Sequence, residues 1–208
     1  MIASELRLDR AAMKALRVTD PYSVHRVVYS LFDDTRDDAR KKSSEASGIL
    51  YADRGGDVRL RRILILSDRH PAPTVDGTHG AVESKPVPEN FLDHDRYRFS
   101  VIVNPTRRDN ASRKLVPAQG REAVAEWFIE RAGNSWGFSP SIPHLTVGRM
   151  SVMRFRDKRE RPVTIGTAVV EGSLTVADRD RFRESFQRGI GRARAFGCGL
   201  MQIIPLSE

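Results

Sequence analysis

The order of the predicted strands and helices is the feature that most limits the folds open to this chain. In the second half, apolar segments of strand character span 97–103, 144–155, 163–171 and 200–205. Apolar residues at helical spacing predict helices at 121–131 and 178–188. A strand, a helix, a pair of strands, a helix and a last strand, in this order, are typical of a ferredoxin-like fold with an antiparallel sheet.

The first half of the chain begins with the same order, although its second helix is not evident. Its predicted strands span 2–8, 49–52 and 58–67, with a hairpin turn at 55–57, and its predicted helices span 10–17 and 20–32. Residues 69–90, rich in proline and glycine, are predicted to be an irregular segment or an interdomain connection. We therefore predict an α+β protein of two tandem ferredoxin-like domains, residues 1–92 and residues 93–208.

The composition favours a polyanionic partner. The net charge is +8 and the isoelectric point is near 10.1, and each Lys or Arg that binds a phosphate releases a counterion. A solvated basic surface is the alternative.

The single cysteine, Cys198, excludes an internal disulfide and fits the reducing cytoplasm. No apolar run approaches the ~20 residues of a membrane helix, so we expect a cytoplasmic protein without a membrane partner.

The predicted helix at 20–32 carries the candidate catalytic residues. Asp20 suits the N-cap, and an apolar stripe follows at helical spacing. Tyr22 and His25 are neighbours on the helix surface and lie off this stripe. In RNA the 2′-hydroxyl beside each phosphate is a nucleophile, so the strand can be cut without metal by a base, an acid and cations that hold the extra negative charge. His25 and Tyr22 suit these roles, and which of them is the base stays open. Surface residues without a role are the alternative.

Basic residues and glycines supply candidate phosphate contacts. Arg26 follows His25 directly, and a glycine-rich loop precedes the last strand. The candidates in that loop are Gly189, Gly191, Arg192, Arg194, Gly197 and Gly199. Two basic clusters are predicted in turns: Arg107, Arg108, Arg113 and Lys114, and Arg154, Arg156, Lys158 and Arg159. The alternatives are a helix stop followed by a strand bulge for the loop, and solvated turns for the clusters.

No metal or cofactor site is predicted. The sequence spacing of the candidate ligands matches no standard zinc-binding pattern. These candidates are His70, His79 and His94 and the aspartates near them. His144 is predicted to be a structural residue of an apolar strand.

Together these segments resemble the CasE family, the repeat-RNA endoribonucleases of type I-E CRISPR systems. The likeness is carried by Pro21-Tyr22-x-x-His25-Arg26, by the strand that ends in Asn104-Pro105 with the basic stretch after it, and by the glycine-rich loop. The resemblance implies tandem ferredoxin-like domains and a catalytic pair of His25 and Tyr22. It also implies a phosphate contact near the cut from Arg154 or Arg156.

The resemblance further implies metal-independent cleavage of precursor CRISPR RNA at the base of the repeat hairpin. The products would be a 2′,3′-cyclic phosphate and a 5′-hydroxyl, and the protein would stay on the mature crRNA within Cascade, beside the other Cascade subunits. A non-catalytic subunit that binds the RNA hairpin is the alternative. A weaker one is an RNA-recognition fold acting on other transcripts, although the chain lacks the aromatic-rich strand motif of such folds.

Overall fold

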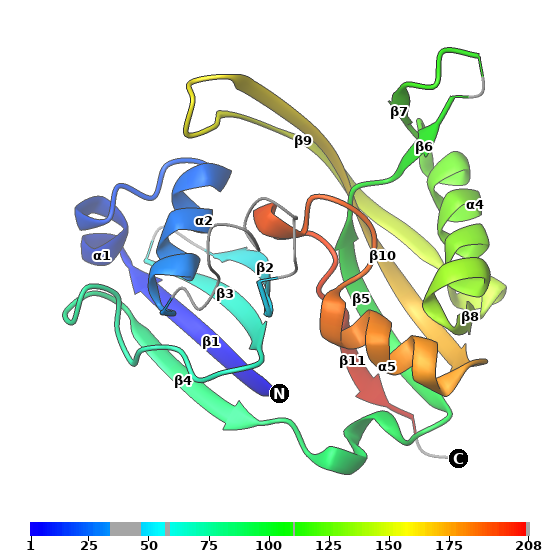
Figure 1. Cartoon of the computed structure of the whole chain (residues 1–208), viewed down its shortest axis with the longest axis horizontal. Helices are drawn as coiled ribbons and strands as arrows, with labels where there is room; N and C mark the ends of the chain where they lie inside the picture. The colour runs from blue at the N-terminus through cyan, green and yellow to red at the C-terminus, as the bar shows by residue number, and fades with distance from the viewer. Residues whose placement is uncertain (34–46, 57–58, 110, 207–208) are drawn as a thin grey trace. The chain divides into compact units, whose positions relative to one another are not determined.

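A computed structural model of the chain describes residues 1–33, 47–56, 59–109 and 111–206 (Figure 1). The chain forms two compact units. The first comprises Met1–Val87 together with Ala195–Gly197, and the second comprises Pro88–Arg194 and Cys198–Glu208. Three residues of the glycine-rich loop therefore belong to the first unit, whereas the loop as a whole was expected in the second domain.

The first unit is an antiparallel sheet with helices on one face (Figure 1). Its elements are β1 (Ile2–Asp9), α1 (Arg10–Ala15), α2 (Pro21–Ser30), β2 (Ile49–Gly56), β3 (Leu60–Ser67) and β4 (Ala81–Pro86). The strand order is β2-β3-β1-β4, which places β1 and β3 at the centre. Val24, Val27 and Val28 of α2 are buried against Leu6 and Ile63 of the central strands. The predicted apolar stripe is thus the core face of α2.

The region predicted to be irregular, 69–90, contains a strand. β4 pairs with β1 along its whole length, from Ala81 opposite Arg7 to Pro86 opposite Ile2. It is an edge strand, exposed and polar, and edge strands tolerate charge and proline because one side has no sheet partner. Gly55 and Gly56, which were predicted to lie in a turn at 55–57, are instead the last two residues of β2. Residues 57–58 lie outside the described part.

The second unit is a larger antiparallel sheet with further short elements. These are η1 (Glu89–Leu92), β5 (Arg96–Val103), β6 (Thr106–Arg108), β7 (Leu115–Pro117), α4 (Arg121–Arg131), the π-helical turn η2 (Ala132–Trp136), β8 (Phe138–Pro140), η3 (Ile142–His144), β9 (Thr146–Arg156), β10 (Pro162–Val176), α5 (Arg179–Arg188), η4 (Arg194–Phe196, of which only Arg194 is in this unit) and β11 (Gln202–Pro205). The sheet order is β11-β5-β10-β8, and β9 pairs with β10.

Both long helices of this unit cover the same face of β5. The ring of Phe99 stacks on that of Phe128 in α4, with centroids 5.5 Å apart, and Tyr97 lies 5.3 Å from Phe182 in α5. Tyr97 and Phe99 are two residues apart on a strand, so they point to the same side. Phe128 and Phe182, which are among the apolar residues that predicted these helices, are both buried.

Several predicted boundaries in the second unit were wrong. His144 is not part of an apolar strand but ends η3 and is exposed. Arg107 and Arg108, predicted to lie in a turn, belong instead to β6, which pairs with β7 in a hairpin of its own. β8 was not predicted, and β11 begins at Gln202 rather than Leu200.

Among the described residues, no helix has the length and apolar character that a bilayer crossing requires.

Candidate active site and nucleic-acid interface

The first turn of α2 is fixed by a reciprocal cap. The Asp20 carboxylate accepts a hydrogen bond from the Ser23 backbone N–H at 2.7 Å, and Ser23 Oγ accepts one from the Asp20 N–H at 2.9 Å. Pro21 occupies the first helical position, where no backbone donor is needed. The predicted N-cap is confirmed. Tyr22 and His25 therefore project from a turn whose backbone is set by local chemistry.

His25 and Tyr22 lie side by side and neither is buried. Their rings stack with centroids 6.0 Å apart and an interplanar angle of 21°. The His25 ring also lies 4.2 Å from the Tyr29 ring and 5.6 Å from the Phe196 ring. These rings restrict the imidazole to a narrow range of orientations while leaving part of it exposed. The arrangement meets the first requirement for an acid–base pair, which is access to a substrate.

A backbone carbonyl orients the imidazole. His25 Nδ1 lies 2.8 Å from the carbonyl oxygen of Ala195. A carbonyl can only accept, so Nδ1 must carry the proton and donate it. In the neutral ring, Nε2 then holds the lone pair that could take a proton from a hydroxyl. The same carbonyl accepts a hydrogen bond from the Tyr51 hydroxyl at 3.0 Å.

Sequence reasoning did not identify Tyr51 or Ala195. Tyr51 reads as one apolar residue of a strand, and Ala195 contributes only its backbone, which leaves no residue-type signal. The glycine two residues later was the available clue. Gly197 has φ +82°, and an added Cβ there would lie 3.1 Å from the Tyr51 ring. The segment can approach Tyr51 closely because residue 197 lacks a side chain.

The glycines of the glycine-rich loop have backbone conformations with positive φ, which glycine adopts readily. Gly189, Gly191, Gly197 and Gly199 all have φ between +72° and +86°. Arg192 is exposed. Arg194 is exposed as well, but it donates to the carbonyl of Arg188 at 2.8 Å, so its guanidinium caps the C-terminal end of α5.

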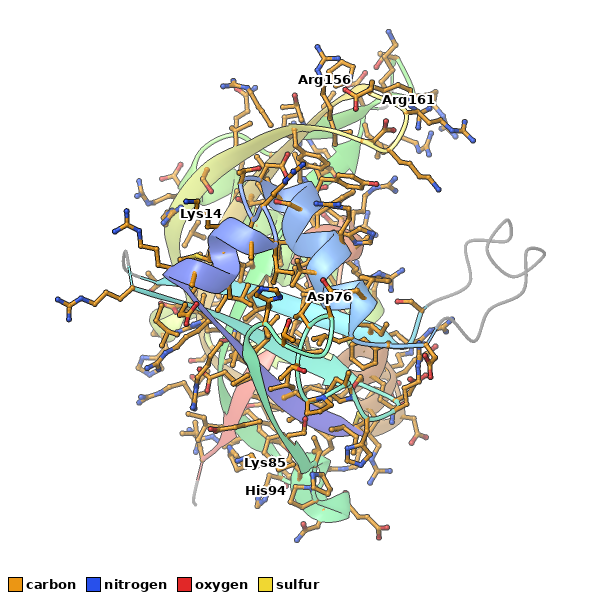
Figure 2. The ribbon with its side chains drawn as sticks, turned by 90° about the vertical axis from the view of Figure 1, so that its left-hand side faces the viewer. Lys14, Asp76, Lys85, His94, Arg156 and Arg161 are labelled. Atoms are coloured by element: carbon orange, nitrogen blue, oxygen red, sulfur yellow. The ribbon has the colours of Figure 1, made fainter. Side chains whose placement is uncertain are left out.

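The β9–β10 hairpin presents most of its cations to solvent (Figure 2). Arg154, Arg156, Lys158 and Arg159 are all exposed. Arg161 is exposed as well, but it forms an ion pair with Asp157 at 2.6 Å. The hydrogen bonds from Arg161 hold the pKa of the Asp157 carboxyl down at about 2. In the described part of the chain, Arg154, Lys158 and Arg159 have no carboxylate partner, so their charge is available to an external anion.

The β6–β7 hairpin carries the other basic cluster. Arg107, Arg108, Arg113 and Lys114 are exposed. Arg108 donates to the Arg113 carbonyl at 2.9 Å, which joins β6 to the segment that precedes β7. Hydrogen bonds from Ser112 lower the pKa of Asp109 within the turn. The predicted cluster is thus a second exposed basic hairpin. On α2, Arg26 is exposed beside His25.

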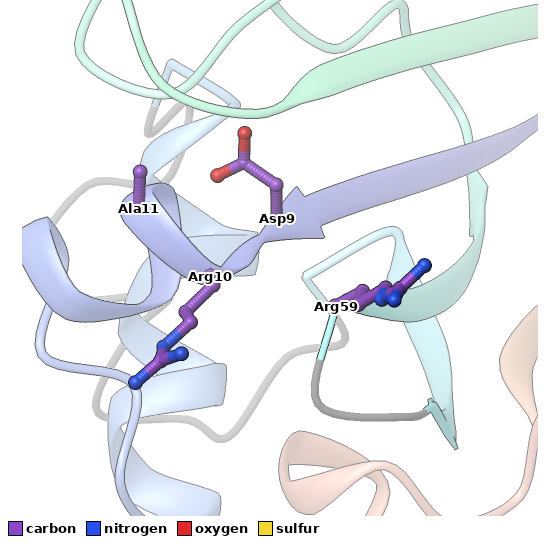
Figure 3. A pocket seen from close by; sticks show the side chains of 4 residues that line it. All are labelled: Asp9, Arg10, Ala11 and Arg59. Atoms are coloured by element: carbon purple, nitrogen blue, oxygen red, sulfur yellow. The ribbon is translucent and has the colours of Figure 1, made fainter.

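A pocket of about 460 Å³ in the first unit does not contain the candidate pair. It is lined by Asp9, Arg10, Ala11 and Arg59 (Figure 3). The Asp9 carboxylate accepts from the Ala12 N–H at 2.7 Å and so caps α1. The described residues include no group of His, Cys, Asp and Glu side chains arranged to hold a metal ion.

Comparisons with known proteins agree with these features. A sequence profile of a family described as CRISPR associated protein matches residues 1–205. The CRISPR-associated endoribonuclease Cse3 of Thermus thermophilus is 24% identical over 215 residues, covering 99% of this chain and 100% of the relative.

Two solved structures are similar to the whole chain. A CRISPR endoribonuclease Cse3 bound to a 19-nucleotide RNA has a TM-score of 0.81 at 20% identity, covering 99% of this chain and 100% of that chain. A chain of a CRISPR RNA-guided surveillance complex in a pre-nicking state has a TM-score of 0.69 at 20% identity, with the same coverage. The strand orders of the two units and this likeness confirm the predicted α+β fold class.

Proposed function

The chain belongs to the family of CRISPR-associated proteins, and from this premise we propose that it is an endoribonuclease that matures CRISPR RNA. Its substrate is precursor CRISPR RNA, cut at the base of the repeat hairpin. The related Cse3 is a CRISPR-associated endoribonuclease. The observation that carries the proposal is the position of His25, which is partly exposed, oriented through Nδ1 by the Ala195 carbonyl, and stacked beside Tyr22.

The reaction follows from RNA chemistry. The 2′-oxygen loses its proton and attacks the adjacent phosphorus while the bond to the 5′-oxygen breaks, which leaves a 2′,3′-cyclic phosphate. The departing 5′-oxygen takes up a proton and becomes a 5′-hydroxyl. His25 and Tyr22 share these two proton transfers, one as base and the other as acid. No metal ion is needed to balance the reaction.

The exposed cations bind the RNA backbone. We propose that the β9–β10 hairpin, the β6–β7 hairpin, Arg26 and the glycine-rich loop with Arg192 contact phosphates. Binding should then weaken steeply with salt, because each phosphate contact releases a counterion. Removing Lys158 and Arg159 together should reduce the slope of log Kd against log salt by roughly 2.

After cleavage the protein stays on the mature crRNA and takes its place in Cascade in the cytoplasm. A similar chain has been seen in a CRISPR RNA-guided surveillance complex, which supports this assignment.

We also propose that the two units are the two functional domains, the first carrying the catalytic helix and the second carrying the basic hairpins. Trp127 and Trp136 are each 7% exposed within the second unit, which does not favour an RNA-recognition fold that stacks bases on tryptophan.

Cleavage of a labelled repeat hairpin in EDTA tests the function. Wild type should cut once at the hairpin base, and His25→Ala should lose at least about 100-fold in rate, the range of general acid–base catalysis. His144→Ala removes another exposed histidine and should cut at the wild-type rate. RNA that is bound but intact with wild type would assign the chain as a non-catalytic hairpin-binding subunit. Full cleavage by His25→Ala would remove the mechanism.

A further inference from the structure

Two side chains of the first unit donate to the same backbone oxygen. The Ala195 carbonyl lies 2.8 Å from His25 Nδ1 and 3.0 Å from the Tyr51 hydroxyl. A carbonyl oxygen has two lone pairs, so both are in use here. The position of this oxygen therefore depends on Tyr51 as well as on the segment of chain that carries it.

Tyr51 is well placed to hold the carbonyl still. It is 1% exposed, lies on β2 opposite Ile65 of β3, and belongs to the apolar core beneath α2. Its ring also lies against Gly197, where an added Cβ would come within 3.1 Å. The segment Ala195–Gly197 thus rests on a side chain that the sheet has already fixed, and rigid supporting residues are what preserve the geometry of a site.

We propose that Tyr51 is a positioning residue: its hydroxyl, acting through the Ala195 carbonyl, holds His25 in the form protonated at Nδ1, which commits Nε2 to the proton transfer. The catalytic part of this inference rests on the proposed nuclease function. In water the neutral imidazole favours the form protonated at Nε2, so the opposite form requires a fixed acceptor at Nδ1. A hydrogen bond to the second ring nitrogen commonly sets the tautomer in this way.

The tautomer can be measured without RNA. In the protein labelled with ¹⁵N at histidine, the neutral His25 ring should show a protonated Nδ1 and an unprotonated Nε2. Tyr51→Phe keeps the ring against Gly197 and removes the hydroxyl alone, so the form protonated at Nε2 should gain population. A wild-type His25 protonated at Nε2 overturns the proposal, and this result is available even if Tyr51→Phe does not fold. An unchanged spectrum in a folded Tyr51→Phe variant also overturns it.

Single-turnover cleavage provides the second measurement. Tyr51→Phe should cleave about 10-fold more slowly, which is the lower end for loss of a supporting hydrogen bond, while its Kd for the repeat hairpin stays within about twofold. Tyr97→Phe is the matched control, because Tyr97 is also buried and donates to the Phe91 carbonyl at 2.8 Å, in the second unit. This control should lose a comparable amount of stability and retain the wild-type rate.

The outcomes separate the two proposals. Equal slowing in Tyr51→Phe and Tyr97→Phe would make Tyr51 a packing residue and overturn the inference. Absence of cleavage by wild type would overturn the nuclease assignment, while the tautomer measurement would still decide whether Tyr51 orients His25.

Discussion

Arg194 Nη1 lies 2.8 Å from the carbonyl oxygen of Arg188, the last residue of α5. This bond satisfies a carbonyl that a helix end leaves without an intrahelical partner, and it places a cation at the negative end of the helix dipole. The guanidinium thus has a structural task inside a loop whose cations were predicted to serve RNA.

Arg194→Ala should therefore lower the free energy of unfolding, by about 1 kcal/mol. Arg192→Ala is the matched control, because Arg192 is exposed in the same loop and has no side-chain partner in the described part of the chain. Urea denaturation should separate the variants, with Arg192→Ala close to wild type. The RNA-binding assay should give the reverse order, with Arg192→Ala weaker at low salt. Equal stability of the two variants would contradict the capping role.

Gly199 should tolerate no side chain. Its φ is +86°, and an added Cβ would lie 2.4 Å from the carbonyl oxygen of Ile190. Its own N–H donates to the Ile102 carbonyl at 2.7 Å, which joins the loop to β5. Gly199→Ala should cost at least about 2 kcal/mol, since backbone must move and a strained conformation must be kept.

Gly77→Ala isolates the cost of the backbone conformation, because Gly77 has φ +75° and nothing within 4 Å of an added Cβ. Thermal unfolding measures the stability of both variants, and Gly77→Ala should lose about 1 kcal/mol. The difference between the two variants measures the clash with Ile190. A Gly199→Ala variant as stable as Gly77→Ala would mean that the loop moves without cost.

The turn of the β9–β10 hairpin should lose its order in acid. The carboxyl of Asp157 has its pKa lowered to about 2 by hydrogen bonds from the Arg161 side chain and from backbone N–H groups. A lowered pKa means that the ionised form is favoured in the folded turn. The stabilisation is therefore complete above the ordinary pKa of about 3.9 and is lost as the pH falls through about 2.

Amide chemical shifts of Arg159 and Arg161, followed against pH, check this prediction. Asp157→Asn should show the acid-state shifts already at pH 7. Glu160→Gln changes the hairpin charge by the same amount, but the Glu160 side chain is exposed and does not bond to the turn, so its shifts should follow wild type. A titration midpoint near 4 for Asp157 would contradict the bonding described.

Cys198 should be unreactive in the folded protein. Its side chain is 0% exposed, and burial raises the pKa of its thiol to about 12. A thiol reacts as the thiolate. At pH 8 the Cys198 thiol is therefore both protonated and inaccessible to a reagent. Under native conditions a disulfide reagent should label less than about one chain in ten within an hour. In denaturant it should label every chain. Rapid native labelling would show that the loop around Gly197 and Gly199 opens readily.

Local signals predicted α2 and α4 well. Asp20, Pro21 and the valine stripe act within a few turns of one helix, and α4 has the predicted bounds Arg121–Arg131. β4 was missed because its charged residues form a strand only through pairing with β1, which lies far away in the sequence. His144 was misplaced because Leu145 and Val147, two residues apart, have the spacing of a half-buried strand.

The catalytic pair could be proposed from residue types and spacing, since both side chains come from one helical turn. The groups that orient the His25 ring could not be predicted in this way. They are a backbone carbonyl and a tyrosine, which only the tertiary structure brings together. Backbone acceptors carry no residue signature, and a strand tyrosine is usually read as core. The capping bond of Arg194 could not be predicted for a related reason, since a helix-capping arginine and a phosphate-binding arginine look the same in the sequence.

The bond between His25 and Ala195 spans 170 residues of chain. During synthesis, helix α2 emerges from the ribosome long before the carbonyl that orients its imidazole. A nascent polypeptide therefore displays the histidine before the acceptor for its Nδ1 has been made. The arrangement around His25 is complete only when the late-made segment Ala195–Gly197 closes onto the early-made helix.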